Sequence, residues 1–202
     1  MSHDGLTRGE LPATATHLCV DMQRLFAEKT DWHTPWMDRV RPIVRRLAGA
    51  HPERTIFTRF IPAERPGEGE GTWKRYYERW DTMTIERLGS EMIELVPELR
   101  ELVPPAEAID KKVYSPWFQP ELGASLARRG SDAVIVSGGE TDVCVLATVL
   151  GAVDRGFRVV IVKDGLCSSS DAAHDASLTL YLDRYGQQVE VATAEEILDG
   201  WR

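Results

Sequence analysis

The segment 134–153 constrains the fold of this chain most. It consists of an apolar run, a glycine-rich turn and a helical pattern. The β-branched run 134–136 predicts a strand, and Ser-Gly-Gly at 137–139 predicts the turn that ends it. Val145, Val149 and Val153 have the spacing of one helix face. A strand that is apolar throughout is typical of a parallel sheet covered on both faces, so this unit predicts an α/β fold.

Cys144 lies in the first turn of the predicted helix. Backbone N–H groups at a helix start have no helical partner, and the helix dipole favours negative charge there. A thiol in this position tends toward thiolate, the nucleophilic form, so Cys144 is a candidate nucleophile. An ordinary buried core cysteine is the alternative interpretation.

Strand and helix patterns alternate along the rest of the chain, which predicts a parallel sheet with right-handed crossovers. We expect a single-domain three-layer α/β/α fold with a mostly parallel, Rossmann-like sheet over residues 16–202, preceded by a flexible N-terminal arm, 1–15. The further strand patterns cover residues 16–21, 55–60, 106–111, 158–162 and 188–191. The further helical patterns cover residues 35–49, 72–83, 121–129 and 171–185, and begin again near 194.

Two other strand patterns end at charged residues, Asp21 and Lys111. The carboxyl ends of parallel strands meet at the edge where α/β folds bind ligands, so Asp21, Lys111 and Cys144 are expected to lie together. A carboxylate that accepts the thiol proton and a nearby ammonium suit nucleophilic catalysis. The alternatives are that Asp21 caps a turn and that Lys111 and Lys112 are solvated loop charges.

Three motif blocks, CVDMQRLF, DKKVYSPWF and SGGETDVCV, resemble those of the isochorismatase-like cysteine hydrolases over residues 16–198. The resemblance implies that Cys144 is the nucleophile, Asp21 the base and then the acid, and Lys111 the charge that polarises the site. Lys111 is chosen over Lys112 because the family spacing Lys-x-x-Tyr-Ser fits it. The resemblance also implies a cis peptide between Gly139 and Glu140, and an oxyanion hole formed by the backbone N–H groups of Glu140 and Cys144.

We expect neither a metal nor a cofactor, because this chain departs from the metal-binding members of the family. Nicotinamidases in this family follow the second strand with an Asp-x-His pattern, whereas this chain continues Arg59-Phe60-Ile61-Pro62 and has no histidine between His51 and His174. His174, in a helical pattern, is interpreted as structural.

Aromatic residues gather around residues 73–80, where a helix would pair Trp73 with Tyr77 and Tyr76 with Trp80. A pocket wall, a dimer interface and ordinary core packing are three open interpretations. The residues predicted to bind substrate are Phe26, Trp73, Tyr77, Trp80 and Phe118.

A net charge of −8 and a pI near 5.2 argue against nucleic acid and anionic membrane as partners. Three cysteines, without a Cys-x-x-Cys pair or a signal-like segment, favour the cytoplasm. The predicted function is cleavage of a C–N bond in a small amide, ureide, hydrazide or lactam through a thioester. The family resemblance implies a homodimer or homotetramer. The alternatives are a non-catalytic protein that binds a metabolite or partner, and hydrolysis of an isochorismate-like vinyl ether.

Overall fold

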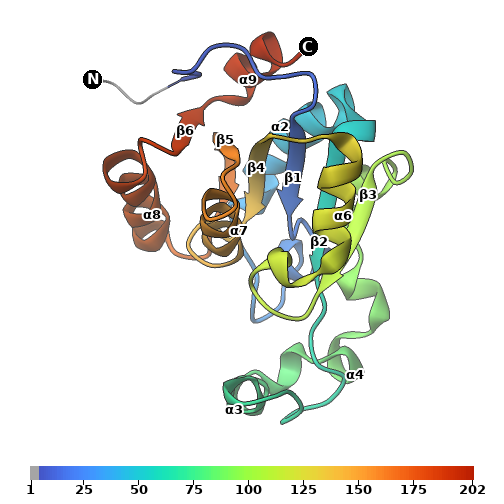
Figure 1. Ribbon diagram of the computed structural model, residues 1–202. Helices are drawn as coiled ribbons and strands as arrows, with labels where there is room; N and C mark the ends of the chain where they lie inside the picture. The colour runs from blue at the N-terminus through green and yellow to red at the C-terminus, as the bar shows by residue number, and fades with distance from the viewer. Residues whose placement is uncertain (1–4) are drawn as a thin grey trace.

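Six parallel strands form one sheet at the centre of the computed structural model, which describes residues 5–202 (Figure 1). The strand order is β3-β2-β1-β4-β5-β6, and every neighbouring pair is parallel. This order confirms the predicted Rossmann-like sheet. The strands are β1 (Thr16–Val20), β2 (Thr55–Phe60), β3 (Glu107–Lys111), β4 (Ala133–Gly139), β5 (Arg158–Cys167) and β6 (Val189–Ala192).

Helices cover both faces of the sheet, which confirms the three-layer architecture. Leu122 of α6 (Pro120–Arg129) and Val149 of α7 (Cys144–Val153) pack with Val136 on one face. Leu47 of α2 (Met37–Ala50) and Ile197 of α9 (Ala194–Gly200) pack with Val160 on the other face. The α-helices are α1 (Arg24–Ala27), α2 (Met37–Ala50), α3 (Thr72–Arg79), α4 (Ile85–Leu88), α5 (Pro97–Arg100), α6 (Pro120–Arg129), α7 (Cys144–Val153), α8 (Asp171–Arg184) and α9 (Ala194–Gly200). The 3₁₀ helices are η1 (Pro52–Arg54), η2 (Asp81–Met83), η3 (Ser90–Ile93) and η4 (Pro116–Phe118).

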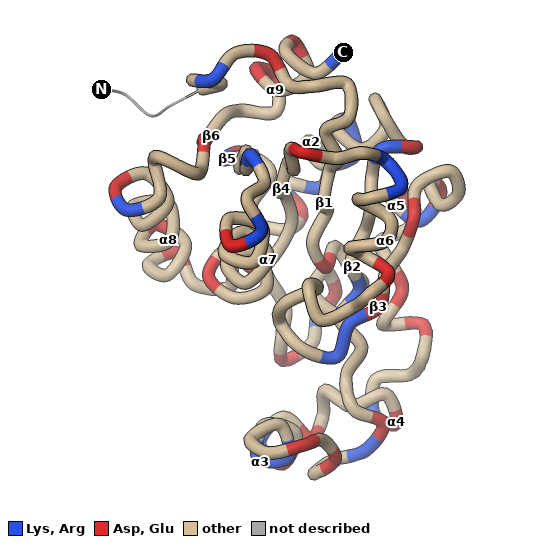
Figure 2. Tube along the Cα trace, in the orientation of Figure 1, with Lys and Arg blue, Asp and Glu red and all other residues tan. Residues whose placement is uncertain are grey.

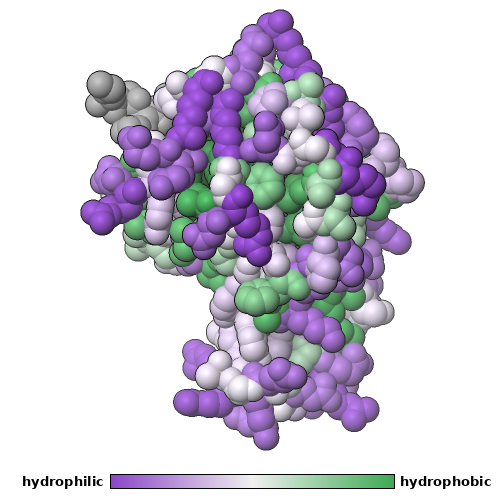
Figure 3. Space-filling view, in the orientation of Figure 1, coloured by the Kyte–Doolittle hydropathy of each residue, from purple (hydrophilic) through white to green (hydrophobic). Residues whose placement is uncertain are grey.

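The segment that contains α3 and α4 projects beyond the carboxyl ends of the strands as a small lobe (Figure 1). Acidic and basic residues alternate along it (Figure 2), and its outer surface in this view is largely hydrophilic (Figure 3). The lobe therefore stands at the edge of the sheet where α/β folds place their ligand sites.

β4 and β5 extend further than their sequence patterns predict. The Ser-Gly-Gly segment expected as a turn is the end of β4, and β5 continues through Lys163-Asp164-Gly165 with a register shift against β4. Gly138 makes this possible, because its φ is +104° and a Cβ there would lie 2.1 Å from the Val20 carbonyl oxygen. Only glycine fits so close to β1 in this conformation.

The boundary of the predicted N-terminal arm stays a prediction. Residues 1–4 lie outside the described residues, and the following segment runs along the end of the sheet. The Gly5 N–H donates to the Val191 carbonyl, and the Leu11 N–H donates to Gly200, both at 2.8 Å. Glu190 is buried, pairs with Arg158 at 2.7 Å and accepts the Arg8 N–H, so an ion pair also holds this segment.

Candidate active site

The ends of β1 and β3 and the start of α7 bring Asp21, Lys111 and Cys144 into contact. Lys111 Nζ lies 2.7 Å from Asp21 Oδ2 and 3.3 Å from Cys144 Sγ. These residues are 90 and 33 positions apart in the chain, so the parallel topology, and no local segment, creates the cluster. All three side chains are buried.

Asp21 adopts a backbone conformation that is uncommon for a residue with a side chain, with a φ of +49°. Thr58 on β2 holds it there: the Asp21 N–H donates to the Thr58 carbonyl and hydroxyl oxygens, and the Thr58 hydroxyl donates to Asp21 Oδ1 at 2.6 Å. One carboxylate oxygen thus faces Thr58 while the other faces Lys111. Backbone strain of this kind is concentrated at functional sites.

Lys111 closes the site from β3 and keeps its charge despite being buried. Burial alone would lower its pKa, but the neighbouring Asp21 carboxylate and the Cys144 sulfur outweigh that effect and raise the pKa above its ordinary value. Its ammonium also donates to the Val113 carbonyl at 3.3 Å and lies 5.0 Å from the centre of the Phe60 ring. Lys111 is therefore a fixed cation between the acid and the thiol.

The surroundings of Cys144 act on the pKa of its thiol in the direction opposite to the helix start. Burial raises the pKa of the Cys144 thiol well above its ordinary value, and the charge of Asp21 and a hydrogen bond to it raise the pKa further. Lys111 acts in the opposite direction but does not outweigh them. Cys144 thus lies beside a carboxylate whose charge raises the pKa of the thiol and which is placed to accept its proton.

The turn before Cys144 contains the cis peptide bond Gly139–Glu140. Val143 and Val145 both donate their N–H groups to the Glu140 carbonyl. Within residues 5–202, the N–H groups of Glu140 and Cys144 donate to no backbone carbonyl. Two N–H groups of this turn therefore lack a backbone carbonyl partner, which is a necessary condition for an oxyanion hole.

A second set of contacts ties the same turn to α8. The Thr141 N–H and hydroxyl both lie within hydrogen-bond distance of the Cys167 carbonyl, at 2.9 and 3.1 Å. His174 Nδ1 lies 2.8 Å from the Thr141 hydroxyl, and the Tyr181 hydroxyl donates to the Thr141 carbonyl. His174 is buried, so its contacts match the structural interpretation, while Cys167 supports the turn from β5.

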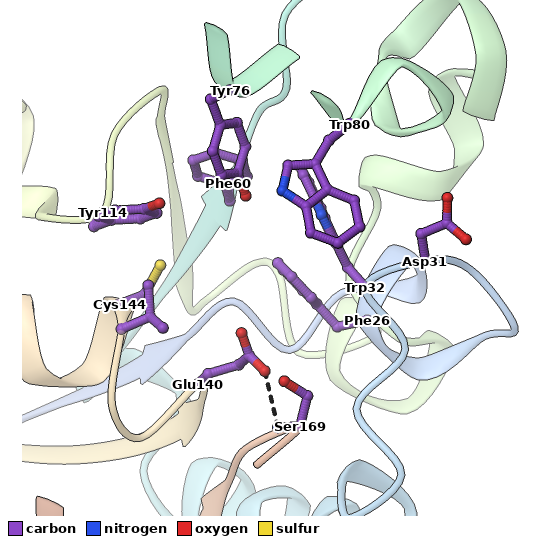
Figure 4. A pocket seen from close by; sticks show the side chains of 11 residues that line it. Phe26, Asp31, Trp32, Phe60, Tyr76, Trp80, Tyr114, Glu140, Cys144 and Ser169 are labelled. Atoms are coloured by element: carbon purple, nitrogen blue, oxygen red, sulfur yellow. Dashed lines mark hydrogen bonds between the residues drawn. The ribbon is translucent and has the colours of Figure 1, made fainter. Parts of the chain in front are cut away.

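Cys144 opens onto a cavity of about 270 Å³ between the sheet edge and the lobe (Figure 4). The cavity has the size of a site for a small molecule. Figure 4 places Cys144 and Tyr114 on one side of it and Trp80 and Trp32 on the other. Its lining consists of Phe26, Asp31, Trp32, Phe60, Tyr76, Trp80, Tyr114, Glu140, Val143, Cys144 and Ser169.

Phe26 and Trp80, among the residues predicted to bind substrate, line this cavity, whereas Trp73 and Tyr77 line a separate one. The helix periodicity of α3 explains the division, because Tyr76 and Trp80 share one face and Trp73 and Tyr77 share the other. Phe118 lines neither cavity.

Phe118 is 77% exposed at the end of η4. Its neighbour Trp117 is partly buried against the core, and its indole N–H donates to the Thr148 carbonyl at 2.8 Å. Apolar character alone does not show which of two adjacent aromatic residues faces the protein.

Six lining residues besides Val143 were not among the sequence candidates: Asp31, Trp32, Phe60, Tyr76, Tyr114 and Ser169. Tyr76 has a usable sequence signal, its i,i+4 spacing with Trp80. Tyr114 has one in the Lys-x-x-Tyr-Ser motif. Asp31 and Ser169 lie in irregular segments whose path depends on the tertiary fold.

Comparison with known protein families gives a match to the isochorismatase domain over residues 15–196. The chain belongs to the isochorismatase family. A maleamate amidohydrolase of Pseudomonas putida is 28% identical to this isochorismatase-family chain over 81 residues, 40% of this chain and 38% of that protein. The chain matches less than half the length of each of the first curated relatives.

Solved structures share the fold of this isochorismatase-family chain. A cysteine hydrolase from Pseudomonas syringae pv. phaseolicola 1448A superposes with a TM-score of 0.79 and 22% identity, covering 95% of each chain. An N-carbamoylsarcosine amidase from Thermoplasma acidophilum gives a TM-score of 0.72 and 19% identity, covering 90% of this chain and 96% of the other. Identities this low establish the fold alone.

A search of residues 5–202 finds no group of three or more His, Cys, Asp or Glu side chains arranged to hold a metal ion. No helix among these residues has the length and apolar character needed to cross a membrane.

Proposed function

We propose that this isochorismatase-family chain is a cysteine amidohydrolase that cleaves a C–N bond of a small amide, ureide, hydrazide or lactam. The observation that carries the proposal is the contact of Lys111 Nζ with both Asp21 Oδ2 and Cys144 Sγ, at 2.7 and 3.3 Å. A purely binding protein has no need for a buried thiol, acid and ammonium at the floor of its cavity. The amidohydrolase and amidase names of the maleamate and N-carbamoylsarcosine enzymes support the same reaction class.

In the first half-reaction, Asp21 accepts the proton of Cys144 as the sulfur attacks the carbonyl carbon of the substrate. The C=O π bond opens, and the N–H groups of Glu140 and Cys144 stabilise the resulting oxyanion. Losing one such donor typically costs about 3 kcal/mol of transition-state stabilisation. Asp21 then donates its proton to the departing nitrogen, the C–N bond breaks, and a thioester remains on Cys144.

In the second half-reaction, Asp21 accepts a proton from a water molecule that attacks the thioester carbonyl. The C–S bond breaks as the tetrahedral intermediate collapses, the acid product leaves, and Asp21 returns the proton to Cys144. Lys111 stays charged throughout, holds Asp21 in place and stabilises the sulfur whenever it carries negative charge.

The proposal is tested by assaying ammonia or amine release from a panel of neutral, cationic and anionic amides, with the wild-type protein, Cys144→Ala and Cys19→Ala. Cys19 is a matched control because it is a buried cysteine of β1 outside the cavity lining. We expect turnover of at least one class by the wild type and Cys19→Ala, and none by Cys144→Ala. Equal turnover by all three proteins would exclude the covalent route and favour acid catalysis without the thiol.

A further inference from the structure

Five aromatic rings line the cavity and are defined here as the aromatic wall: Phe26, Trp32, Phe60, Tyr76 and Trp80. Trp32 lies at its centre. Its ring centroid is 5.8 Å from those of Phe60 and Tyr76, and 6.3 Å from that of Trp80. The rings come from the β1–α2 segment, β2 and the lobe, so the folded chain holds several π surfaces around one space (Figure 4).

The charged groups that line this cavity are both acids, Asp31 and Glu140. Asp31 lies beside Trp32 and Trp80, at the end of the cavity away from Cys144 (Figure 4). The Thr82 hydroxyl donates to its Oδ2 at 2.5 Å and orients the carboxylate. Glu140 accepts the Ser169 N–H at 2.8 Å.

No lysine or arginine side chain occurs in the cavity lining that the structure describes. Lys111, the nearest cation to Cys144, is 1% exposed and paired with Asp21, so it is not free to bind an anionic group of a substrate. A carboxylate in this cavity would face two acidic side chains without a free positive partner.

We propose that the cavity selects amides whose end remote from the carbonyl carries an alkylammonium group, held by the aromatic wall and Asp31. This inference rests on the proposed function and specifies the substrate class of the same site. Aromatic faces attract cations through the ring quadrupole, Trp most strongly. Asp31 adds a carboxylate at the same end, while the amide carbonyl lies against Cys144 at the other.

The test uses three amides with the same three-methylene spacer: 4-(trimethylammonio)butanamide, its carbon isostere 5,5-dimethylhexanamide, and glutaramate, which carries a carboxylate. We expect kcat/KM to be at least about tenfold higher for the ammonium amide than for the isostere, and lowest for glutaramate. Equal values for the ammonium amide and the isostere, or preference for glutaramate, would overturn the proposal.

Two variants test which side chains cause the preference. We expect the ratio of kcat/KM for the ammonium amide over the isostere to fall in Asp31→Asn and in Trp80→Leu. Asp38→Asn, which alters an exposed acid of α2 outside the cavity, is expected to keep the wild-type ratio. An unchanged ratio in folded Asp31→Asn would remove Asp31 from the proposal.

Binding separates this inference from the proposed function. Isothermal titration of Cys144→Ala with the same three amides measures recognition without chemistry. Tighter binding of the ammonium amide supports the inference even if the wild-type protein hydrolyses none of the three, an outcome that counts against the amidohydrolase. Hydrolysis without any preference for the ammonium, in rates or in binding, overturns the inference and leaves the amidohydrolase standing.

Discussion

The Thr58 hydroxyl donates a 2.6 Å hydrogen bond to Oδ1 of Asp21, the carboxylate oxygen that does not face Lys111. Through this contact β2 fixes the orientation of an acid at the end of β1, and a proton acceptor is effective only when its geometry is fixed. The positioning of Asp21 therefore involves a residue that no sequence motif singled out.

Thr58→Val removes this hydrogen bond with little change in side-chain volume. Because a hydrogen bond to a charged group is worth about 1.5–3 kcal/mol, we expect kcat/KM to fall by about 10- to 100-fold. Thr58→Ser keeps the hydroxyl and serves as the control. Steady-state rates on any amide that the wild type hydrolyses check the prediction, and equal rates in Thr58→Val and Thr58→Ser would contradict it.

Asp21→Asn is expected to change thiol reactivity and catalysis in opposite directions. Burial raises the pKa of Cys144 most, but the Asp21 carboxylate adds to the rise, and Lys111 remains in the variant to favour thiolate. We therefore expect iodoacetamide to alkylate Cys144 faster in Asp21→Asn than in the wild type at pH 7, while amide turnover falls by at least about 100-fold. Mass spectrometry of the Cys144 peptide measures the alkylation. Slower alkylation of the variant would contradict this account of the thiol.

Removing one member of the buried Asp21–Lys111 pair leaves the other charge without a partner. We expect Lys111→Met to lower the free energy of unfolding by about 3–5 kcal/mol, and the double variant Asp21→Asn, Lys111→Met to recover much of that loss. Urea unfolding of the three proteins measures the effect. A double variant less stable than Lys111→Met would show that the pair itself, and not the unpaired charge, dominates.

The buried His17 makes the free energy of unfolding depend on pH. It is buried between Ser137 and Thr55, and burial lowers its pKa from 6.5 to about 3. The unfolded chain binds the proton near pH 6.5 and the folded chain does not, so stability present above pH 6.5 is lost as the pH falls toward 3. From pH 6.5 to 4.5 this contribution is about 2–3 kcal/mol. His17→Gln should lose that much less stability over the same interval, as measured by urea unfolding at each pH.

Gly138 allows the close approach of β4 to β1, and Gly123 of α6 serves as its control. Gly138→Ala would place a Cβ against the Val20 carbonyl at a positive φ, and we expect a loss of about 3 kcal/mol or more. At Gly123, an exposed position of α6, the added Cβ meets nothing within 4 Å. We therefore expect Gly123→Ala to raise the free energy of unfolding by about 0.5–1 kcal/mol. Thermal unfolding compares the two, and similar effects would contradict the assigned role of Gly138.

The sheet was predictable from the sequence because its central strand β4 is apolar and buried along its length and strand patterns alternate with helical segments. The contact among Asp21, Lys111 and Cys144 was also predictable in outline. Asp21 follows β1, Lys111 ends β3 and Cys144 begins α7, all at the same edge of the sheet. The raised pKa of the Cys144 thiol was not predictable, because it depends on burial and on the neighbouring Asp21 carboxylate, which helix position alone does not determine. The N–H groups at a helix start favour thiolate only where the surroundings allow the charge.

The substrate-facing wall was the least predictable part of the site. Trp73, Tyr76, Tyr77 and Trp80 have the same composition signal, and only the orientation of α3 decides which pair faces Cys144. Trp32 lies in an irregular segment whose position depends on the lobe that packs against it. Residues on connections between elements carry no periodicity from which their direction could be read.

The most direct test of the central claim is intact-protein mass spectrometry of the enzyme after acid quench during turnover of an amide substrate. The account predicts a mass increase equal to the acyl group of that substrate, located on the peptide that contains Cys144 and absent in Cys144→Ala. Sustained turnover without any adduct on Cys144, and with undiminished activity in Cys144→Ala, would contradict it.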